Sequence, residues 1–265
     1  PEQRIVPQHG ALRSAFVEPY RCTNVLFQGI TLRQAQFWQL HPTLCSNVTV
    51  DSVTTGATAN LNTDGCNPES CDHVVIKRCA FDAADDCIAI KSGRDEDGRR
   101  VNVPSQNIVI FSCRLRGPSG GLAFGSEMTG GIRNVYAYDL QTDAAGVQYM
   151  FHVKSNTKRG GFAERLRLDT VRADRLSGGW ALAQMDYNGQ NGDHSPVFRD
   201  WSIGNASGDS DPWVLHLSGR PDSPIRGVEV HQSVFTNIGD PINQFSNVSE
   251  IQLNDVSVNG RRVLA

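Results

Sequence analysis

The feature that most constrains the fold is an eleven-residue motif that recurs nine times along the chain. Each copy has a polar residue followed by alternating apolar positions, as in CSNVTVDSVTT at 45–55 and SQNIVIFSCRL at 105–115. The third residue of the copies falls at 24, 47, 73, 107, 134, 165, 200, 227 and 250. Alternation rich in Val and Ile predicts short strands, and the Gly, Asn, Asp and Ser between copies predict turns. No segment shows helical periodicity over 11 residues.

Self-similarity at this spacing is typical of solenoids, in which each repeat forms one coil and stacked coils bury a continuous core. Residues of one type recur at single repeat positions: Cys22, Cys45 and Cys71 at one, and Asn24, Asn47, Asn107 and Asn134 at another. A stacked ladder of small buried side chains explains this better than a disulfide framework, a zinc site or a β-sandwich. We therefore predict an all-β chain, a right-handed parallel β-helix of about nine coils, with residues 1–265 forming one domain.

Three intervals between copies are longer than the rest and contain the stretches 93–105, 142–161 and 186–198. Long intervals predict loop insertions. In a solenoid such loops fall on one face and often border the binding site.

The composition limits the kinds of partner that the chain is expected to bind. The chain is 39% hydrophobic and 20% charged, typical of a folded protein, and its net charge of −3 without a basic run argues against nucleic acid. No apolar stretch approaches the roughly 20 residues of a membrane span, so we expect no membrane insertion. This mild acidity does not exclude a polyanionic substrate, because a few Lys and Arg in a cleft can outweigh the overall sign.

Two acidic motifs lie about one coil apart, NTDG at 62–65 and ADDCIAIK at 84–91. Asp64 and Asp85 are 21 residues apart, so equivalent places on adjacent coils would bring their carboxylates to one surface. Clustering them with Asp86 pushes the three pKa values apart, leaving one group protonated and another ionised. Hydrolysis of a glycosidic bond needs that division. The alternatives are an ordinary solvated turn or a calcium site.

Four motifs in order resemble glycoside hydrolase family 28, the polygalacturonase family of pectin hydrolases. They are NTDG (62–65), DDCIAIKSG (85–93), GGLAFGSEMTGGIRNV (120–135) and VKSNTKRGG (153–161). The resemblance runs from about residue 18 to about residue 260. It implies a parallel β-helix that hydrolyses pectic polysaccharide or oligosaccharide with inversion, using no metal and no cofactor.

Roles carried over by motif position make Asp85 the general acid, and Asp64 and Asp86 the pair that activates water. Six further positions are expected to bind substrate: Asn62, Ser119, Glu127, His152, Lys154 and Tyr187. Lys91 fits a cleft and a solvated surface equally well. Trp38 and the other tryptophans fit the core better than a sugar platform.

The chain departs from the family pattern twice. Ser119 stands at the usual His and His152 at the usual Arg, while Lys154 is retained. Because Arg offers a permanent bidentate charge and His does not, carboxylate recognition should weaken by about 1.5–3 kcal/mol. Three explanations stay open: a different sugar or linkage, such as a rhamnogalacturonan or an unsaturated galacturonide; slow polygalacturonase activity; or a noncatalytic pectin-binding paralogue.

The resemblance carries three further expectations. Family members usually have additional N-terminal coils, so residues 1–20 should cap the solenoid or its end should self-associate. A pectic substrate predicts a secreted or periplasmic protein, although no signal peptide is visible and a cytoplasmic location stays open. The main rival function is a β-helix pectate-lyase-like enzyme, which would use calcium and eliminate instead of hydrolysing.

Overall fold

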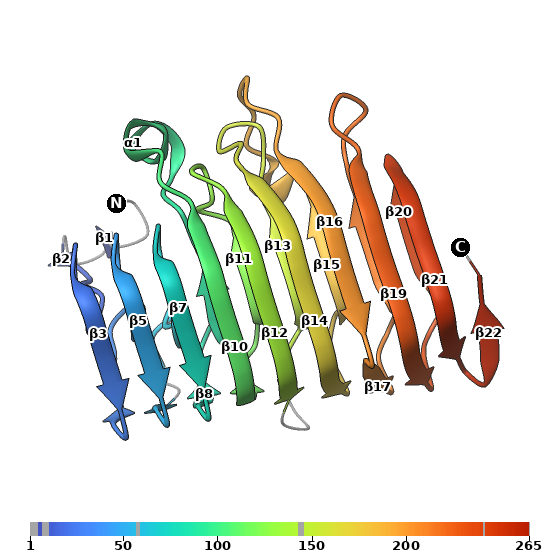
Figure 1. Cartoon of the computed structure of the whole chain (residues 1–265), viewed down its shortest axis with the longest axis horizontal. Helices are drawn as coiled ribbons and strands as arrows, with labels where there is room; N and C mark the ends of the chain where they lie inside the picture. The colour runs from blue at the N-terminus through green and yellow to red at the C-terminus, as the bar shows by residue number, and fades with distance from the viewer. Residues whose placement is uncertain (1–4, 7–10, 57–58, 143–145, 241, 265) are drawn as a thin grey trace.

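The computed structural model describes residues 5–6, 11–56, 59–142, 146–240 and 242–264. Its strands stack side by side along one long axis (Figure 1). Each motif copy forms one strand of a first row: β3 (Thr23–Gln28), β5 (Ser46–Asp51), β7 (Asp72–Lys77), β10 (Ser105–Arg116), β12 (Ile132–Thr142), β14 (Phe162–Asp174), β16 (Val197–Gly204), β19 (Ile225–Thr236) and β21 (Val248–Val258). These nine pair in parallel and in chain order, which confirms the predicted right-handed parallel β-helix.

A second row lies behind the first in Figure 1. Its strands are β9 (Ile88–Ile90), β11 (Gly120–Gly125), β13 (Tyr149–Lys154), β15 (Gly179–Gln184), β18 (Leu215–Ser218) and β20 (Asn243–Ser246). Isolated parallel bridges extend this row toward the N-terminus, joining Val17 to Leu40, Leu40 to Cys66, and Cys66 to Ile88. This row positions the candidate site.

Shorter strands complete the stack. Four of them pair with the first row's sheet: β4 (Thr31–Leu32), β6 (Thr54–Thr55), β8 (Ala80–Asp82) and β17 (Ser207–Asp209). At the C-terminal end β22 (Arg261–Val263) folds back antiparallel onto β21. At the other end β1 (Ile5–Val6) and β2 (Ala11–Leu12) form an antiparallel pair. The predicted cap over 1–20 falls partly on residues 1–4 and 7–10, outside the described residues.

The third residue of all nine motif copies has a left-handed backbone, with φ between 53° and 66°. Asn tolerates this conformation better than other residues with a side chain, which explains Asn24, Asn47, Asn107 and Asn134. A second left-handed residue follows five positions later in every copy, as at Gly29 and Ser52. Each coil therefore turns twice at fixed places, which separates short strands such as β3 from β4.

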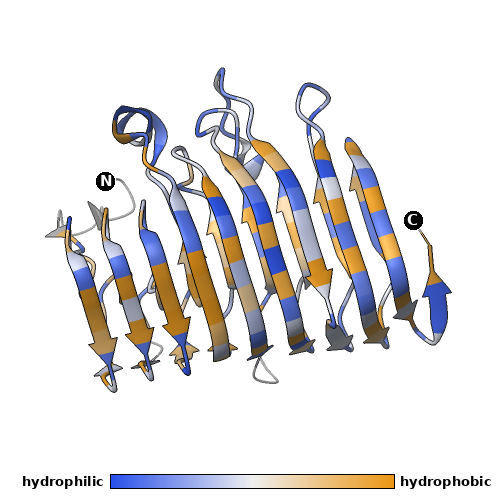
Figure 2. Cartoon of the chain, in the orientation of Figure 1, coloured by the Kyte–Doolittle hydropathy of each residue, from blue (hydrophilic) through white to orange (hydrophobic). Residues whose placement is uncertain are grey.

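The core is a set of inward ladders. Leu40, Cys66, Ile88, Leu122 and Phe151 follow one another in register on successive coils, and each is at most 1% exposed. Burying each such aliphatic or aromatic side chain contributes about 1.5–3 kcal/mol. Figure 2 shows apolar and polar residues alternating along β14, β19 and β21, as one buried face requires.

The cysteine ladder is present, and all seven thiols are free. Cys45 and Cys71 are buried, whereas Cys22, on the first coil of the ladder, is exposed. The expectation that all three ladder cysteines are buried is therefore wrong for Cys22.

Two of the loop insertions contain short helical segments. The loop insertion 93–105 contains helix α1 (Asp95–Val101), and the insertion 186–198 contains a 3-10 turn, η2 (Tyr187–Gly189). Helix α1 has acidic residues in its first turn and basic residues in its last, and Arg99 pairs with Glu96. Such local charge pairing favours a short helix without an apolar face. Helix α1 and the loops that follow β13 and β15 emerge at the same edge of the stack (Figure 1).

Candidate active site

The bridge between Cys66 and Ile88 sets the register of the acidic motifs. Because each bridge residue lies two positions after an aspartate, Asp64 is level with Asp86 on the next coil. The N–H of Gly65 donates to the Asp86 carbonyl at 3.0 Å, in agreement with this register. The coil offset at this point is therefore 22 residues and not the 21 that separate Asp64 from Asp85.

The three aspartates line one small polar pocket above the second row. Its walls are Trp38, Asn62, Asp64, Asp85, Asp86, Lys91, Ser126, Glu127, Lys154 and Tyr187. Seven of the nine residues predicted for the site are in this set. The other two, Ser119 and His152, lie behind it and contact its residues.

Asp86 is held by three donors. Lys154 Nζ donates to Oδ2 at 2.8 Å, while Ser119 Oγ and the Gly120 N–H both donate to Oδ1 at 2.7 Å. A Cβ at Gly120 would lie 2.8 Å from that Oδ1, so the close approach requires glycine. Burial alone would raise the pKa of Asp86, but the Lys154 charge and hydrogen bond help to outweigh it and the pKa falls to about 2. Asp86 is therefore ionised at neutral pH.

Asp85 is the only partly exposed carboxylate of the three. Its Oδ2 accepts from Asn62 Nδ2 at 3.2 Å, and its Oδ1 accepts from the Asp86 N–H at 2.9 Å. Burial and then the negative charge of Asp86 raise the pKa of Asp85, against the opposing effect of Lys154. The group that faces the pocket opening is thus one that retains its proton more readily than a free aspartate.

Asp64 is buried, and its Oδ2 accepts from Asn67 Nδ2 at 2.8 Å. Lys91 Nζ lies 3.7 Å from the same oxygen. Burial raises the pKa of Asp64 to about 7, and the charges of Asp85 and Asp86 add to this rise despite Lys91. The three carboxyl groups therefore differ widely in their tendency to ionise.

Glu127 lies in the pocket wall with its carboxylate engaged by cations. Lys91 Nζ donates to Oε2 at 2.9 Å, and Arg159 Nη2 lies 3.4 Å from Oε1. Although burial opposes ionisation, Lys91 and Arg159 hold the pKa of Glu127 well below its usual range. These contacts fit a role in holding Lys91 beside Asp64 better than the direct substrate contact expected from the motif.

His152 is 4% exposed and its ring packs edge-on against Tyr149, with centroids 4.9 Å apart. Its Nε2 lies 3.2 Å from Gln184 Nε2. Burial and the neighbouring Lys154 lower the pKa of His152 to about 3, so the imidazole is neutral. It does not supply the charge of the family's usual arginine.

Lys154 and Tyr187 lie next to each other, with Lys154 Nζ 5.4 Å from the Tyr187 ring centroid. Their substrate contacts, like those of Asn62, stay predictions.

Sequence reasoning missed Trp38 and left Lys91 undecided. Lys91 Nζ lies 4.5 Å from the Trp38 ring centroid, and both line the pocket. One signal was available: Trp38 precedes Asp64 by 26 residues, the spacing between the motif copies centred on 47 and 73. Trp38 therefore occupies the same repeat position as Asp64 one coil earlier.

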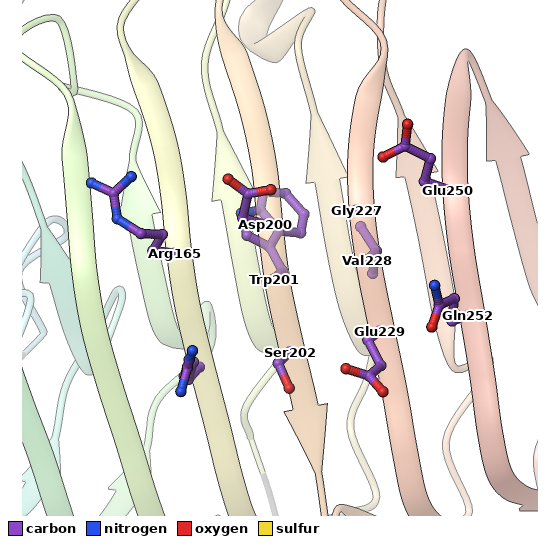
Figure 3. Close-up of a pocket in the computed structure, with 10 residues that line it drawn as sticks. Arg165, Asp200, Trp201, Ser202, Gly227, Val228, Glu229, Glu250 and Gln252 are labelled. Atoms are coloured by element: carbon purple, nitrogen blue, oxygen red, sulfur yellow. The ribbon is translucent and has the colours of Figure 1, made fainter.

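A larger hollow of about 460 Å³ lies on the outer face of β14, β16, β19 and β21 (Figure 3). The third residues of successive motif copies, among them Arg165, Asp200 and Glu250, form a row on this face. The hollow is centred on Gly227, the member of the row that has no side chain. Arg165 is already paired with Glu164 at 2.8 Å. The hollow is thus a missing side chain in a surface row, and its three carboxylates, Asp200, Glu229 and Glu250, come from three different strands.

Two further observations concern the described residues. They contain no group of three or more His, Cys, Asp or Glu arranged to hold a metal ion. Within the same ranges, no helix is long and apolar enough to cross a membrane.

The fold and site together define a parallel β-helix protein with a carboxylate and lysine centre on one row of strands. The family model for glycosyl hydrolases family 28 matches residues 7–196, and the chain belongs to this family. The resemblance drawn from the four motifs is confirmed, and it places the chain in a family of glycosidases.

The individual proteins that the chain is similar to carry names of the same kind. A probable polygalacturonase of Vitis vinifera is 28% identical over 224 residues, 82% of this chain and 45% of that protein. A putative galacturan 1,4-alpha-galacturonidase A of Aspergillus niger is 26% identical over 42% of this chain and 25% of its own length. A hyperthermoactive exopolygalacturonase of Thermotoga maritima superposes with a TM-score of 0.88 at 30% identity, covering 98% of this chain and 58% of its own. The chain spans less than half the length of these curated relatives.

Proposed function

We propose that this chain carries the catalytic centre of an inverting glycosidase that cleaves pectic polysaccharide or oligosaccharide in the manner of a polygalacturonase. One observation carries the proposal: Asp86, ionised beside Lys154, is the sequence neighbour of Asp85, whose pKa is raised. An acid and a base of unlike pKa in one pocket are what an inverting hydrolysis requires.

In the proposed reaction Asp85 donates its proton to the glycosidic oxygen as the bond from that oxygen to the anomeric carbon breaks. A water molecule attacks the anomeric carbon from the opposite face and gives its proton to Asp86. Asp85 suits the acid role because its pKa is raised and it is partly exposed. Proton exchange with solvent then restores both groups.

The resemblance by motif position implies that Asp64 and Asp86 share the role of activating water. We propose that they divide this role. Asp86 is ionised over a wide pH range and accepts the proton of the water. Asp64, with its pKa raised to about 7, carries a proton in mildly acidic solution and orients the same water through hydrogen bonding. The level placement of the two residues on adjacent coils supports this pairing.

A pectic substrate is supported by the family and by the polygalacturonases among its relatives. Because pectin lies outside the cytoplasm, we propose that the protein acts there. Neutral His152, together with Lys154 already paired to Asp86, argues for weaker recognition of the galacturonate carboxylate than the usual arginine would give.

The test is incubation of the protein with homogalacturonan and rhamnogalacturonan oligosaccharides, followed by mass analysis of the products. We expect saturated products one water heavier in sum than the substrate. Asp85→Asn should reduce turnover about 10²–10⁴-fold, while Asp82→Asn, on the neighbouring strand β8, should not. Unsaturated, ultraviolet-absorbing products would show a lyase, and equal rates for Asp85→Asn and wild type would refute the assigned acid.

A further inference from the structure

On the C-terminal side of the aspartates, the side chains of the second row of strands become uncharged. Parallel pairing places Lys154, Gln184, Ser218 and Ser246 in one column across β13, β15, β18 and β20. The sequences of the last three strands, GWALAQ, LHLS and NQFS, contain no Lys, Arg, Asp or Glu. The column that begins with a lysine at the catalytic pocket therefore continues with amide and hydroxyl groups.

A second column runs beside the first, two residues earlier on each strand. It places His152, Leu182, His216 and Gln244 in register. Because side chains two residues apart on a strand share a face, both columns are on the outward face of the row. From Leu182 onward the members of this column are partly or fully exposed.

A hollow of about 610 Å³ lies over these two columns. It lies next to the catalytic pocket along the row, because Gln184, which lines the hollow, is in register on the next coil with Lys154, which lines the pocket. The His216 ring is stacked on Trp213 with centroids 3.7 Å apart and planes 11° apart, which fixes its orientation. Among the described residues that line this hollow, Asp186 is the one Asp, Glu, Lys or Arg.

We propose that this hollow is a subsite for a neutral sugar residue of the substrate chain, next to the residue held at the catalytic pocket. Amides and hydroxyls match the hydroxyl groups of a sugar, while Leu182 and the His216 ring offer apolar surface to its C–H face. A galacturonate in the same place would find no Lys or Arg among the described lining residues and would approach Asp186, so its carboxylate would lose solvation without gaining an opposite charge.

The geometry suits the adjoining residue of a chain. Adjacent coils are separated by about 4.8 Å, close to the length of one sugar ring, so a chain running along the row advances about one residue per coil. This inference rests on the proposed function and deepens it: the preferred substrate carries a neutral sugar on the side of the cleaved linkage that lies over β15, β18 and β20.

The experiment compares two size-matched oligosaccharides, one of galacturonate only and one in which galacturonate alternates with a neutral deoxyhexose. Binding is measured by titration calorimetry on Asp85→Asn, which prevents turnover, and hydrolysis is measured separately on the wild type. Ser218→Lys, in the same Asp85→Asn background, adds an ammonium group to the subsite. Ser202→Lys places the same change at a partly exposed serine on the outer face of β16 as the matched control.

We expect the alternating oligosaccharide to bind roughly tenfold more tightly, and Ser218→Lys to strengthen binding of the galacturonate oligomer by about tenfold, the effect of one charged hydrogen bond. Ser202→Lys should change neither. Equal or tighter binding of the galacturonate oligomer, or no binding of either, would overturn the subsite. Preferential binding without hydrolysis of either ligand would support the subsite and refute the proposed activity.

Discussion

The ammonium group of Lys154 lies 2.8 Å from Oδ2 of Asp86, and neither residue is more than 5% exposed. Lys154 is at the end of β13 and Asp86 lies just before β9, 68 residues earlier in the chain. The parallel stacking of coils brings them together. A buried ion pair of this kind keeps one carboxylate charged where burial alone would neutralise it.

Removing the cation tests this relationship. In Lys154→Met, burial is no longer balanced and the pKa of Asp86 should rise. Because the base must be ionised, the acidic limb of the pH profile of kcat/KM should move to higher pH, with a loss of at least about tenfold at pH 5. Lys158→Met, at an exposed lysine four residues away, is the control. An unmoved acidic limb in Lys154→Met would show that Lys154 does not set the charge of Asp86.

Glu127 should act through Lys91 and Arg159. Glu127→Gln leaves two buried cations without their carboxylate, so the free energy of unfolding should fall by about 3 kcal/mol. If Glu127 only positions Lys91, kcat should fall and the pH profile should shift while KM changes little. Denaturant unfolding and steady-state kinetics check this. A large rise in KM at unchanged kcat would instead restore the direct substrate contact predicted from the motif.

The raised pKa of Asp64 predicts a pH-dependent stability. Because the folded pKa of about 7 lies above the ordinary value of 3.8, the neutral carboxyl is favoured by folding. Its contribution is fully present below 3.8 and is lost as the pH rises through about 7. The Tm should therefore fall between pH 5 and pH 8, and Asp64→Asn should reduce this decline, leaving the part contributed by Asp211, whose pKa burial also raises to about 7.

The contribution of Asp86 to stability changes with pH in the opposite direction, and it does so at lower pH. Its folded pKa of about 2 means that its contribution is present above 3.8 and is lost as the pH falls toward 2. Asp186→Asn, at an exposed aspartate, should keep the wild-type slope at both ends. A slope between pH 5 and pH 8 that is as steep in Asp64→Asn as in the wild type would place its origin elsewhere.

The left-handed third position predicts a backbone effect separate from catalysis. Asn134→Val forces a β-branched residue to φ of 54°, which should cost about 1–2 kcal/mol of stability. Gly227→Asn, at φ of 66° in an equivalent position, should be tolerated because asparagine suits this conformation. Equal thermal stability of Asn134→Val and the wild type would contradict the proposed reason for the asparagine repeat.

Much of the fold was predictable because one pattern recurs with every coil. In every coil the alternating apolar residues must point inward, and this requirement made all nine first-row strands predictable. The second turn of each coil was not predictable, since its left-handed residues include Gly29, Ser52 and Arg78, which share no side-chain chemistry. Helix α1 was missed because local charge pairs stabilise it and no apolar periodicity marks it.

The site was predictable to the extent that its motifs are contiguous. Asp85 and Asp86 are adjacent in sequence, and Asp64 lies about one coil earlier. The surroundings of Lys91 could not be predicted from the sequence, because its partner Glu127 is 36 residues away and its burial depends on the stacked coils. His152 likewise looked like a weak cation, and only its burial beside Lys154 makes it neutral.

The central claim is that Asp85 and Asp86 act as acid and base in a single displacement with inversion. The most direct measurement is proton NMR of the first product during hydrolysis of a pectic oligosaccharide, before the anomers equilibrate. Cleavage of an α-linkage should release the β-anomer first. Initial release of the α-anomer would contradict the account, because it would require a covalent intermediate on one of the carboxylates.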